Sequence, residues 1–280
     1  MTDHRLILLS PEDNCLIAGA RLEAGTQIEI EGGTDTQRRV FTTALYHATM
    51  TPTTYSDVNG DYRGPDNAVH RAQGFEFHST WSLWDVYRAQ QPLMVLLQPQ
   101  RSVDFVQSLI AAREASPFGI LPVWAYQGLE TWCMIGYHAV PVIADAYVKG
   151  IRGFDAKAGL DAMVASATYA PYGGLGEYMQ RGYVPIDKEP EGASKTLEYA
   201  YDDWTIAQMA KVMGRGDVAA TFAKRAGNWR NAYDANVSTV CAFQQMVTRH
   251  RNDLCHSRPV VMLNGRIHHA RASLELPPDR

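Results

Sequence analysis

Beyond residue 35 the chain is a succession of segments with apolar residues at helical spacing, most of them bounded by proline or glycine. A first segment begins at Thr36 and is ended by Pro52, and seven more follow over 80–90, 102–115, 133–149, 156–169, 174–180, 194–213 and 218–233. Strand-like alternation is nearly confined to residues 27–31. Because several segments are apolar on more than one face, each needs helices on several sides. The pattern therefore predicts a mainly α fold, a helical array or toroid, after a short β or irregular N-terminal segment.

Composition divides the chain into three parts. Residues 1–35 mix short apolar runs with Gly and Pro, whereas 36–235 carry the helical segments. Residues 236–280 are rich in Arg and His and show no sustained period. The sequence thus predicts one helical domain over 36–235, between a linker remnant and an aperiodic tail.

Charge and hydropathy exclude several classes of partner. The formal net charge is −4 and no basic stripe interleaves with the aromatic residues, so a nucleic-acid partner is not expected. No apolar run approaches the ~18 residues of a membrane span. The first twenty residues make a poor secretory signal, because Pro11, Glu12 and Asp13 interrupt a short apolar stretch. The location of the chain is left open.

The run STWSLWDVYR (79–88) carries the clearest sign of a binding site. On a helix Trp81, Trp84 and Asp85 fall within one turn and share a face with Arg88. An indole beside a carboxylate suits a sugar, whose C–H face stacks on the ring while its hydroxyls donate to the acid. The alternative is a pair of core tryptophans with Asp85 as a cap or an ion-pair partner.

Three further places offer carboxylates or a histidine. The run DVNGD from Asp57 begins like a calcium loop, but Tyr62 and Ala68 replace the required Gly and Glu, which leaves an Asx-rich turn or a cleft-lining loop. Glu130 is a candidate acid or hydroxyl ligand, or else a helix cap. His138 fits a hydrogen-bonded buried histidine better than a metal ligand, because no second histidine lies at ligand spacing.

The segment KTLEYAYDDW (195–204) places acidic and aromatic residues on one predicted helix. Glu198 and Asp202 are four residues apart, so like charges share a face unless they are paired or bound. Either this face is a sugar site or it is solvated, with Lys195 as the partner of the acids. Glycoside hydrolysis needs two carboxyl groups that flank the bond, and sequence spacing does not select the pair.

Taken together, these segments resemble glycoside hydrolase family 92, the calcium-dependent exo-acting α-mannosidases. The resemblance covers roughly residues 28–235 and rests on the runs IEGGTDTQRRVFTTALYHATMTP (30–52), SDVNGDYRG (56–64), STWSLWDVYRAQQPL (79–93), LPVW (121–124), ETWCMIGYHAVPVIADAYVKGIRGFD (130–155), GYVPID (182–187) and SKTLEYAYDDWTIAQMAKVMG (194–214). It implies a β-sandwich followed by an (α/α)6 toroid, with inverting hydrolysis of terminal α-linked mannose and Ca²⁺ that helps to distort the ring. It also implies export to the periplasm or the medium.

Residue by residue, the resemblance assigns Trp84 and Asp85 to the mannose that is cleaved. Asp57, Glu130, His138 and Glu198 are candidate cleft residues without an assigned role, and the resemblance identifies no metal ligand in this chain. The family's general acid and base lie in motifs of the type E-G-N-x-W-Q-Y and G-N-x-D, and neither occurs here. No residue of this chain is therefore expected to be catalytic.

These absences lead to the expectation of a fragment, about the first half of the toroid, followed by a tail typical of a shifted reading frame. Half a toroid also predicts apolar helix faces without partners. Three functions follow: a mannosidase by ancestry that is inactive alone, a non-catalytic carbohydrate-binding or scaffold remnant, and one half of a split enzyme completed by a separate chain.

Overall fold

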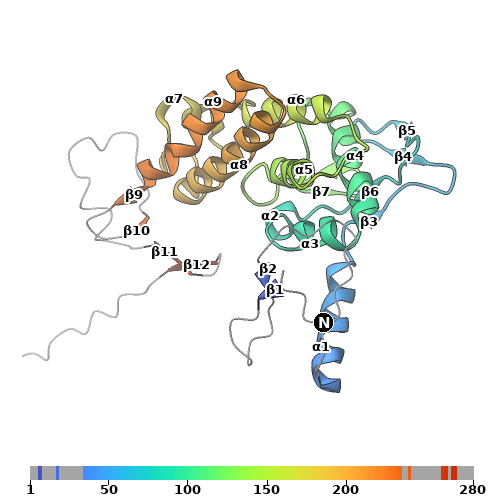
Figure 1. Ribbon diagram of the computed structural model, residues 1–280. Coiled ribbons are helices and arrows are strands. Elements are labelled where there is room, and N and C mark those ends of the chain that lie inside the picture. The colour runs from blue at the N-terminus through green and yellow to red at the C-terminus, as the bar shows by residue number, and fades with distance from the viewer. Residues whose placement is uncertain are drawn as a thin grey trace, which may run out of the picture.

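The computed structural model describes residues 34–234 and short backbone segments at 6–7, 17–18, 239–240, 260–263 and 266–269. Figure 1 shows a mainly helical molecule, which confirms the predicted fold class. The helices are α1 (Asp35–Ala48), α2 (Leu83–Val86), α3 (Gln90–Leu97), α4 (Pro99–Glu114), α5 (Ala139–Val148), α6 (Ala156–Ala167), α7 (Leu175–Arg181), α8 (Gly192–Val212) and α9 (Gly216–Ala226), and the 3-10 helix η1 (Gly227–Ala232) follows α9.

The strands are short and form small antiparallel sheets. They are β1 (Leu6–Ile7), β2 (Ile17–Ala18), β3 (Thr53–Thr54), β4 (Asp61–Arg63), β5 (Val69–Arg71), β6 (His78–Ser79), β7 (Ala125–Tyr126), β8 (Leu129–Glu130), β9 (Tyr233–Asp234), β10 (Thr239–Val240), β11 (Val260–Leu263) and β12 (Arg266–His269). The pairs are β1–β2, β3–β6, β4–β5 and β7–β8, and a four-stranded sheet has the order β12-β11-β10-β9. The strand expected over 27–31 lies outside the described residues.

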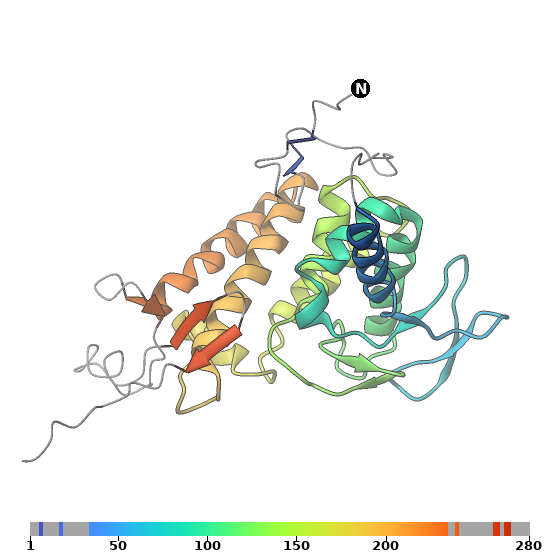
Figure 2. The ribbon, with the colours of Figure 1, turned by 90° about the horizontal axis from the view of Figure 1, so that it is seen from below.

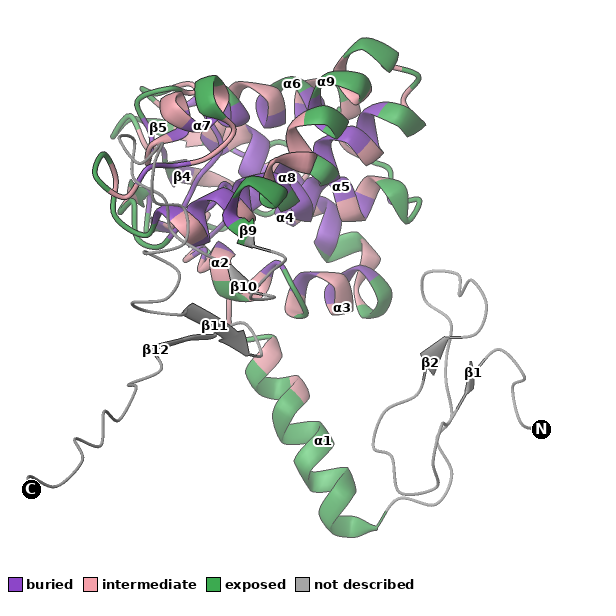
Figure 3. Cartoon of the chain, turned by 90° about the vertical axis from the view of Figure 1, so that its left-hand side faces the viewer, coloured by how far each residue is buried: buried purple, intermediate pink, exposed green. Residues whose placement is uncertain are grey.

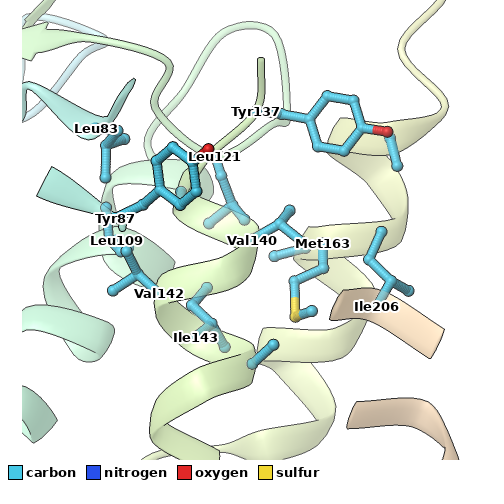
Figure 4. Close-up of a cluster of buried hydrophobic side chains, with 14 of the residues drawn as sticks. Leu83, Tyr87, Leu109, Leu121, Tyr137, Val140, Val142, Ile143, Met163 and Ile206 are labelled. Carbon is cyan, nitrogen blue, oxygen red and sulfur yellow. The ribbon is translucent and has the colours of Figure 1, made fainter. Parts of the chain in front are cut away.

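Helix α5 lies at the centre of the core. Seven of its ten residues are buried, as expected of a helix that is apolar on most sides. It packs against α3, α4, α6 and α8. In the close-up, Ile143 of α5 lies between Leu109 of α4 and Met163 of α6 (Figure 4). At Gly159 of α6 an added Cβ would lie only 3.3 Å from Ile143, so this glycine lets the two helices approach closely.

Helix α8 is the longest of the described helices and joins the core to the C-terminal part of the domain. It contacts α5 and α6 on one side and α9 on the other. The connection from α8 to α9 is short, and Figure 2 shows the two helices side by side as a hairpin. Within the described part of the chain, no helix combines the length and apolar character that crossing a bilayer requires.

Helix α1 projects from the rest of the domain and buries none of its residues (Figure 3). It is well formed locally, because Thr34 and Gln37 make a reciprocal capping box at its start. Val40, Phe41 and Tyr46 are each more than 60% exposed, at 64%, 63% and 64%. Helix α1 therefore exposes large apolar side chains on more than one side.

Two of the predicted helices differ from the structure. The helix expected over 80–90 is the single turn α2, and α3 follows it. Pro92 does not break α3, because it lies in the first turn, where backbone N–H groups have no partner within the helix. The helix expected over 133–149 begins only at Ala139, because the preceding residues form a loop with positive φ at Met134 and Gly136. The remaining predicted helices begin and end within a few residues of those observed, except that η1 replaces the C-terminal part of the last one.

Candidate functional site

The two tryptophans of the run 79–88 have different environments. Trp81 lies before α2, is only 1% exposed and packs edge-to-face on Phe105. Its indole N–H donates to the carbonyl of His78, so Trp81 is a core residue. Trp84 lies on α2 and is partly exposed, and Asp85 beside it is exposed. The predicted face shared by Trp81, Trp84 and Asp85 is wrong, because the helix begins only at Leu83.

Glu198 of α8 binds Trp84 of α2 and the two residues that directly follow this helix, Tyr87 and Arg88. The indole Nε1–H of Trp84 donates to its Oε1 at 3.3 Å. The hydroxyl of Tyr87 donates to its Oε2 at 3.0 Å. The guanidinium of Arg88 pairs with Oε1 at 3.6 Å and also donates to the Tyr87 hydroxyl. One buried carboxylate therefore fixes the helix that carries Trp84 and Asp85.

His138 lies between Glu198 and Asp202, which are one turn apart on α8. Its Nδ1 is 2.8 Å from Oδ1 of Asp202, and its Nε2 is 3.5 Å from Oε2 of Glu198. The ring of Tyr87 stacks on the imidazole, with centroids 4.1 Å apart and planes at 10°. His138 is 1% exposed, which confirms the prediction of a hydrogen-bonded buried histidine. The Nε2 atom has no hydrogen-bond partner among the described residues.

Asp203 belongs to a second network of hydrogen bonds, next along α8 to that of Glu198, His138 and Asp202. Its Oδ1 accepts the hydroxyl of Tyr137 at 2.8 Å, and its Oδ2 accepts the hydroxyl of Tyr178 at 2.9 Å. The Nε–H of Arg225, on α9, donates to Oδ2 at 3.0 Å. The network fastens α7, α8 and α9 to the loop before α5. Its role is structural, because each carboxylate oxygen is bound by buried protein groups.

The acids of α8 are therefore not a solvated face. Glu198, Asp202 and Asp203 are 5%, 0% and 0% exposed. Lys195, the partner that a solvated face would use, instead pairs with Glu189 at 2.5 Å. The solvated-face prediction is wrong because the partners of the acids come from segments far away in the sequence.

Burial shapes the protonation of these groups. It raises the pKa of the Asp203 carboxyl from 3.8 to about 6, against the opposing effect of Arg225. It also raises the pKa of Asp202, although His138 favours the ionised form. The pKa of the Tyr87 hydroxyl is raised by burial and by the nearby charge of Glu198. The Tyr87 hydroxyl is therefore a hydrogen-bond donor over the whole physiological range.

Glu130 is engaged by its own loop. One of its oxygens accepts the backbone N–H of Val123 at 2.7 Å, and the other accepts those of Trp124 and Trp132, both at 2.9 Å. Trp132 has a φ of 56°, so this carboxylate stabilises a loop with left-handed backbone. Glu130 is not the cap of α5, because that helix begins only at Ala139.

Asp57 lies in an exposed turn. Its backbone carbonyl accepts the N–H of Gly60 at 2.9 Å, and its N–H donates to the carbonyl of Asp61 at 2.8 Å. Within the turn Asn59 donates to the Asp61 side chain at 2.8 Å, and Arg71 pairs with that carboxylate at 2.6 Å. Throughout the part that the structure describes, no three His, Cys, Asp or Glu side chains converge as a metal site requires. Among the described residues, this turn therefore offers no such cluster to a Ca²⁺ ion.

Tyr87 was not singled out from the sequence, although it contacts both Glu198 and His138. Its hydroxyl donates to Glu198 and its ring covers His138. The signal was present, since Trp84, Tyr87 and Arg88 are three and four residues apart and share a helix face. On α8, Tyr201 stacks on Trp204 with centroids 6.1 Å apart and extends this aromatic surface outward from Tyr87. Both rings are exposed, at 41% and 49%.

Chemically, the arrangement offers a recognition surface. Consecutive residues of α2 carry a partly exposed indole and an exposed carboxylate, while the buried acids of α8 are bound by protein groups. An exposed carboxylate accepts hydroxyl donors, and an aromatic face takes up an apolar C–H face. Such side chains are of the types that take up a polyol, and the buried acids leave no two free carboxyl groups at one bond.

Comparison with known proteins gives the family. Residues 24–258 match the model of the glycosyl hydrolase family 92 catalytic domain, so the match continues past residue 235, where the resemblance was expected to end. An uncharacterized secreted glycosidase from Arthroderma benhamiae is 26% identical over 221 residues, which cover 73% of this chain and 24% of that protein.

Two solved structures have a similar fold. A family GH92 α-mannosidase from Bacteroides thetaiotaomicron, in complex with mannoimidazole, is 42% identical, with a TM-score of 0.73 over 75% of this chain and 28% of that chain. A family GH92 inverting mannosidase from Bacteroides thetaiotaomicron VPI-5482 is 37% identical, with a TM-score of 0.69 over 77% of this chain and 30% of that chain. The chain thus spans less than a third of the length of these relatives. It belongs to glycosyl hydrolase family 92.

Proposed function

We propose that this chain provides the mannose-holding part of an inverting exo-α-mannosidase, with Trp84 and Asp85 as the residues that hold a terminal α-linked mannose. The observation that carries the proposal is that the exposed Asp85 follows the partly exposed Trp84 on α2, a single helical turn that Glu198 holds through the Trp84 indole. The indole takes the C–H face of the sugar, and the carboxylate accepts its hydroxyls. The similarity to two GH92 mannosidases supports mannose as the sugar.

We further propose that the 280-residue chain alone does not hydrolyse mannosides. Its sequence has no motif for the general acid or base of the family. The buried acids near the proposed sugar, Glu198 and Asp202, are held by Trp84, Tyr87, His138 and the backbone of Tyr137. Inverting hydrolysis needs one free acid and one free base about 6.5–9.5 Å apart.

The experiment has two arms on the intact chain. Titration with methyl α-D-mannopyranoside, followed by NMR or calorimetry, is expected to show saturable binding that is stronger than for the C2 epimer methyl α-D-glucopyranoside. Incubation with an α-1,2-mannobiose is expected to release no mannose. Equal binding of both glycosides would refute the mannose assignment, and sustained release of mannose would refute the non-catalytic part.

A second candidate function is favoured by the exposed apolar side chains of α1. Val40 and Phe41 are 64% and 63% exposed on a helix that buries none of its residues. Isolated domains rarely expose clusters of such side chains. In this candidate the chain is completed by the remaining part of a catalytic domain, on a separate polypeptide, and becomes active only in that complex. Mixing with that polypeptide and assaying mannobiose cleavage distinguishes it from a binding remnant.

A further inference from the structure

The helix that carries the proposed sugar-binding pair is weakly defined by its own sequence. Helix α2 has four residues, and its N-cap Ser82 makes no side-chain capping hydrogen bond. So short a helix is not stable alone, because one turn fixes several backbone angles for very few hydrogen bonds. Leu83 anchors it in the core at 0% exposure, whereas Trp84 is partly buried against the core and Asp85 is exposed. The orientation of this pair must therefore come from outside the helix.

Glu198 supplies that orientation. Its carboxylate binds the indole N–H of Trp84 and the hydroxyl of Tyr87, and it pairs with Arg88. These three residues flank Asp85 on both sides in the sequence. Glu198 itself is 5% exposed, so its hydrogen bonds are shielded from water and held on a rigid helix of twenty-one residues.

We propose that Glu198 is a positioning residue for sugar binding, acting through Trp84 and through the placement of Asp85, without touching the sugar. This inference rests on the proposed mannose site and deepens it. Loss of the carboxylate frees the indole to rotate and lets the single turn of α2 fray. The binding surface then loses its preorganisation, and affinity falls because the sugar has to order the surface as it binds.

The test compares Glu198→Gln with the matched control Glu177→Gln in the full chain. Glu177 is a carboxylate on α7 paired with Arg181, so the control makes the same chemical change outside the site. With methyl α-D-mannopyranoside as the probe, Glu198→Gln is expected to weaken binding about tenfold, the equivalent of roughly 1.4 kcal/mol. The control is expected to bind as the parent chain does.

A spectroscopic reading separates positioning from general damage. The indole Nε1–H resonance of Trp84, assigned with a Trp84→Phe variant, is expected to shift in Glu198→Gln and to stay in place in Glu177→Gln. Tyr87→Phe provides a second variant if Glu198→Gln fails to fold. It removes one donor to Glu198 but keeps the aromatic ring that covers His138, and we expect a smaller loss of affinity with an intact fold.

The outcomes are distinct. Weaker binding with a shifted indole resonance supports the inference. Unchanged affinity in Glu198→Gln, or in Tyr87→Phe where only that variant folds, overturns it and leaves the proposed mannose site standing. Failure of the parent chain to bind the mannoside overturns both proposals at once.

Discussion

The imidazole of His138 is held by Asp202, with Nδ1 of the histidine 2.8 Å from Oδ1 of the carboxylate. The other oxygen of Asp202 accepts the backbone N–H of Tyr137 at 2.9 Å. Asp202 thereby ties the loop before α5 to the middle of α8. Asp202→Ala is expected to lower the free energy of unfolding by about 3 kcal/mol, because it leaves buried donors without partners. Urea denaturation followed by circular dichroism measures the change.

Asp161→Ala is the matched control for that substitution. Asp161 lies on α6 with its side chain 48% exposed and pairs only with Lys157 at 2.7 Å among the described residues. Such surface pairs contribute at most about 1 kcal/mol. Equal losses in the two variants would contradict a special role for Asp202.

Asp203 gives the chain a defined pH dependence. Its pKa is about 6 in the folded chain because of burial, against 3.8 for a free carboxyl. Between these values the folded chain binds more protons than the unfolded chain, so stability falls as pH rises through this window. The contribution is fully present below the lower value and lost above the upper one. The full change corresponds to about 3 kcal/mol.

Asp203→Asn removes this titration and provides the reference curve. From about pH 4 to pH 6, the parent chain is expected to lose stability relative to Asp203→Asn. Melting curves of both proteins across that range measure the difference. A parent chain that gains stability relative to the variant would show that the ion pair with Arg225 outweighs burial.

Asp85 tests the sugar site directly. Asp85→Asn keeps the shape of the side chain but replaces the carboxylate, whose two charged oxygens would accept sugar hydroxyls, with a neutral amide. Affinity for methyl α-D-mannopyranoside is expected to fall about tenfold, as for loss of a charged hydrogen bond. Because Asp85 is exposed, the melting temperature stays close to that of the parent. Asp217→Asn, with a side chain 77% exposed on α9, is the control and binds normally.

Helix α1 is expected to make the chain prone to associate with further copies of itself. Val40 and Phe41 are 64% and 63% exposed on a helix with no buried residue. Light scattering of the parent chain is expected to show concentration-dependent association, and the double substitution Val40→Glu, Phe41→Asp is expected to reduce it. Val69→Glu changes an apolar residue that is 75% exposed on β5 and leaves association unchanged. A parent chain that stays monomeric at high concentration would contradict this account of α1.

Glu130 is expected to stabilise its own loop and not to contact the sugar. Glu130→Gln offers one acceptor oxygen where the carboxylate offers two, so one of the bound N–H groups of Val123, Trp124 and Trp132 loses its partner. The cost is expected to be about 1–2 kcal/mol in thermal or urea unfolding. Affinity for the mannoside stays unchanged. Selective loss of affinity at unchanged stability would instead place Glu130 at the sugar.

Local patterns predicted most of the helices. The segment expected over 194–213 is α8, at Gly192–Val212, and that over 156–169 is α6, at Ala156–Ala167. Strands β3 to β8 are two or three residues long, so they have no alternation to detect. The start of α5 was misplaced because Asp202 takes the backbone N–H of Tyr137, a partner that local periodicity does not reveal.

The site was predicted only in part for the same reason. The composition of α8 indicated an acidic and aromatic segment, but not that Glu198 faces Trp84 or that Asp203 faces Arg225. Those pairings depend on how separate helices pack. Trp81 is buried and Trp84 is partly exposed because α2 begins only at Leu83. A helix of four residues is too short for its start to be predicted from the sequence pattern.

The contacts of Glu198 with Trp84 and Tyr87 span 114 and 111 residues of the chain. Contacts between segments so distant in sequence form only after the intervening chain has been brought together, which slows their formation. Binding at the proposed mannose site is therefore expected to be a late reporter of folding. In a refolding experiment, recovery of helical signal should precede recovery of mannoside binding.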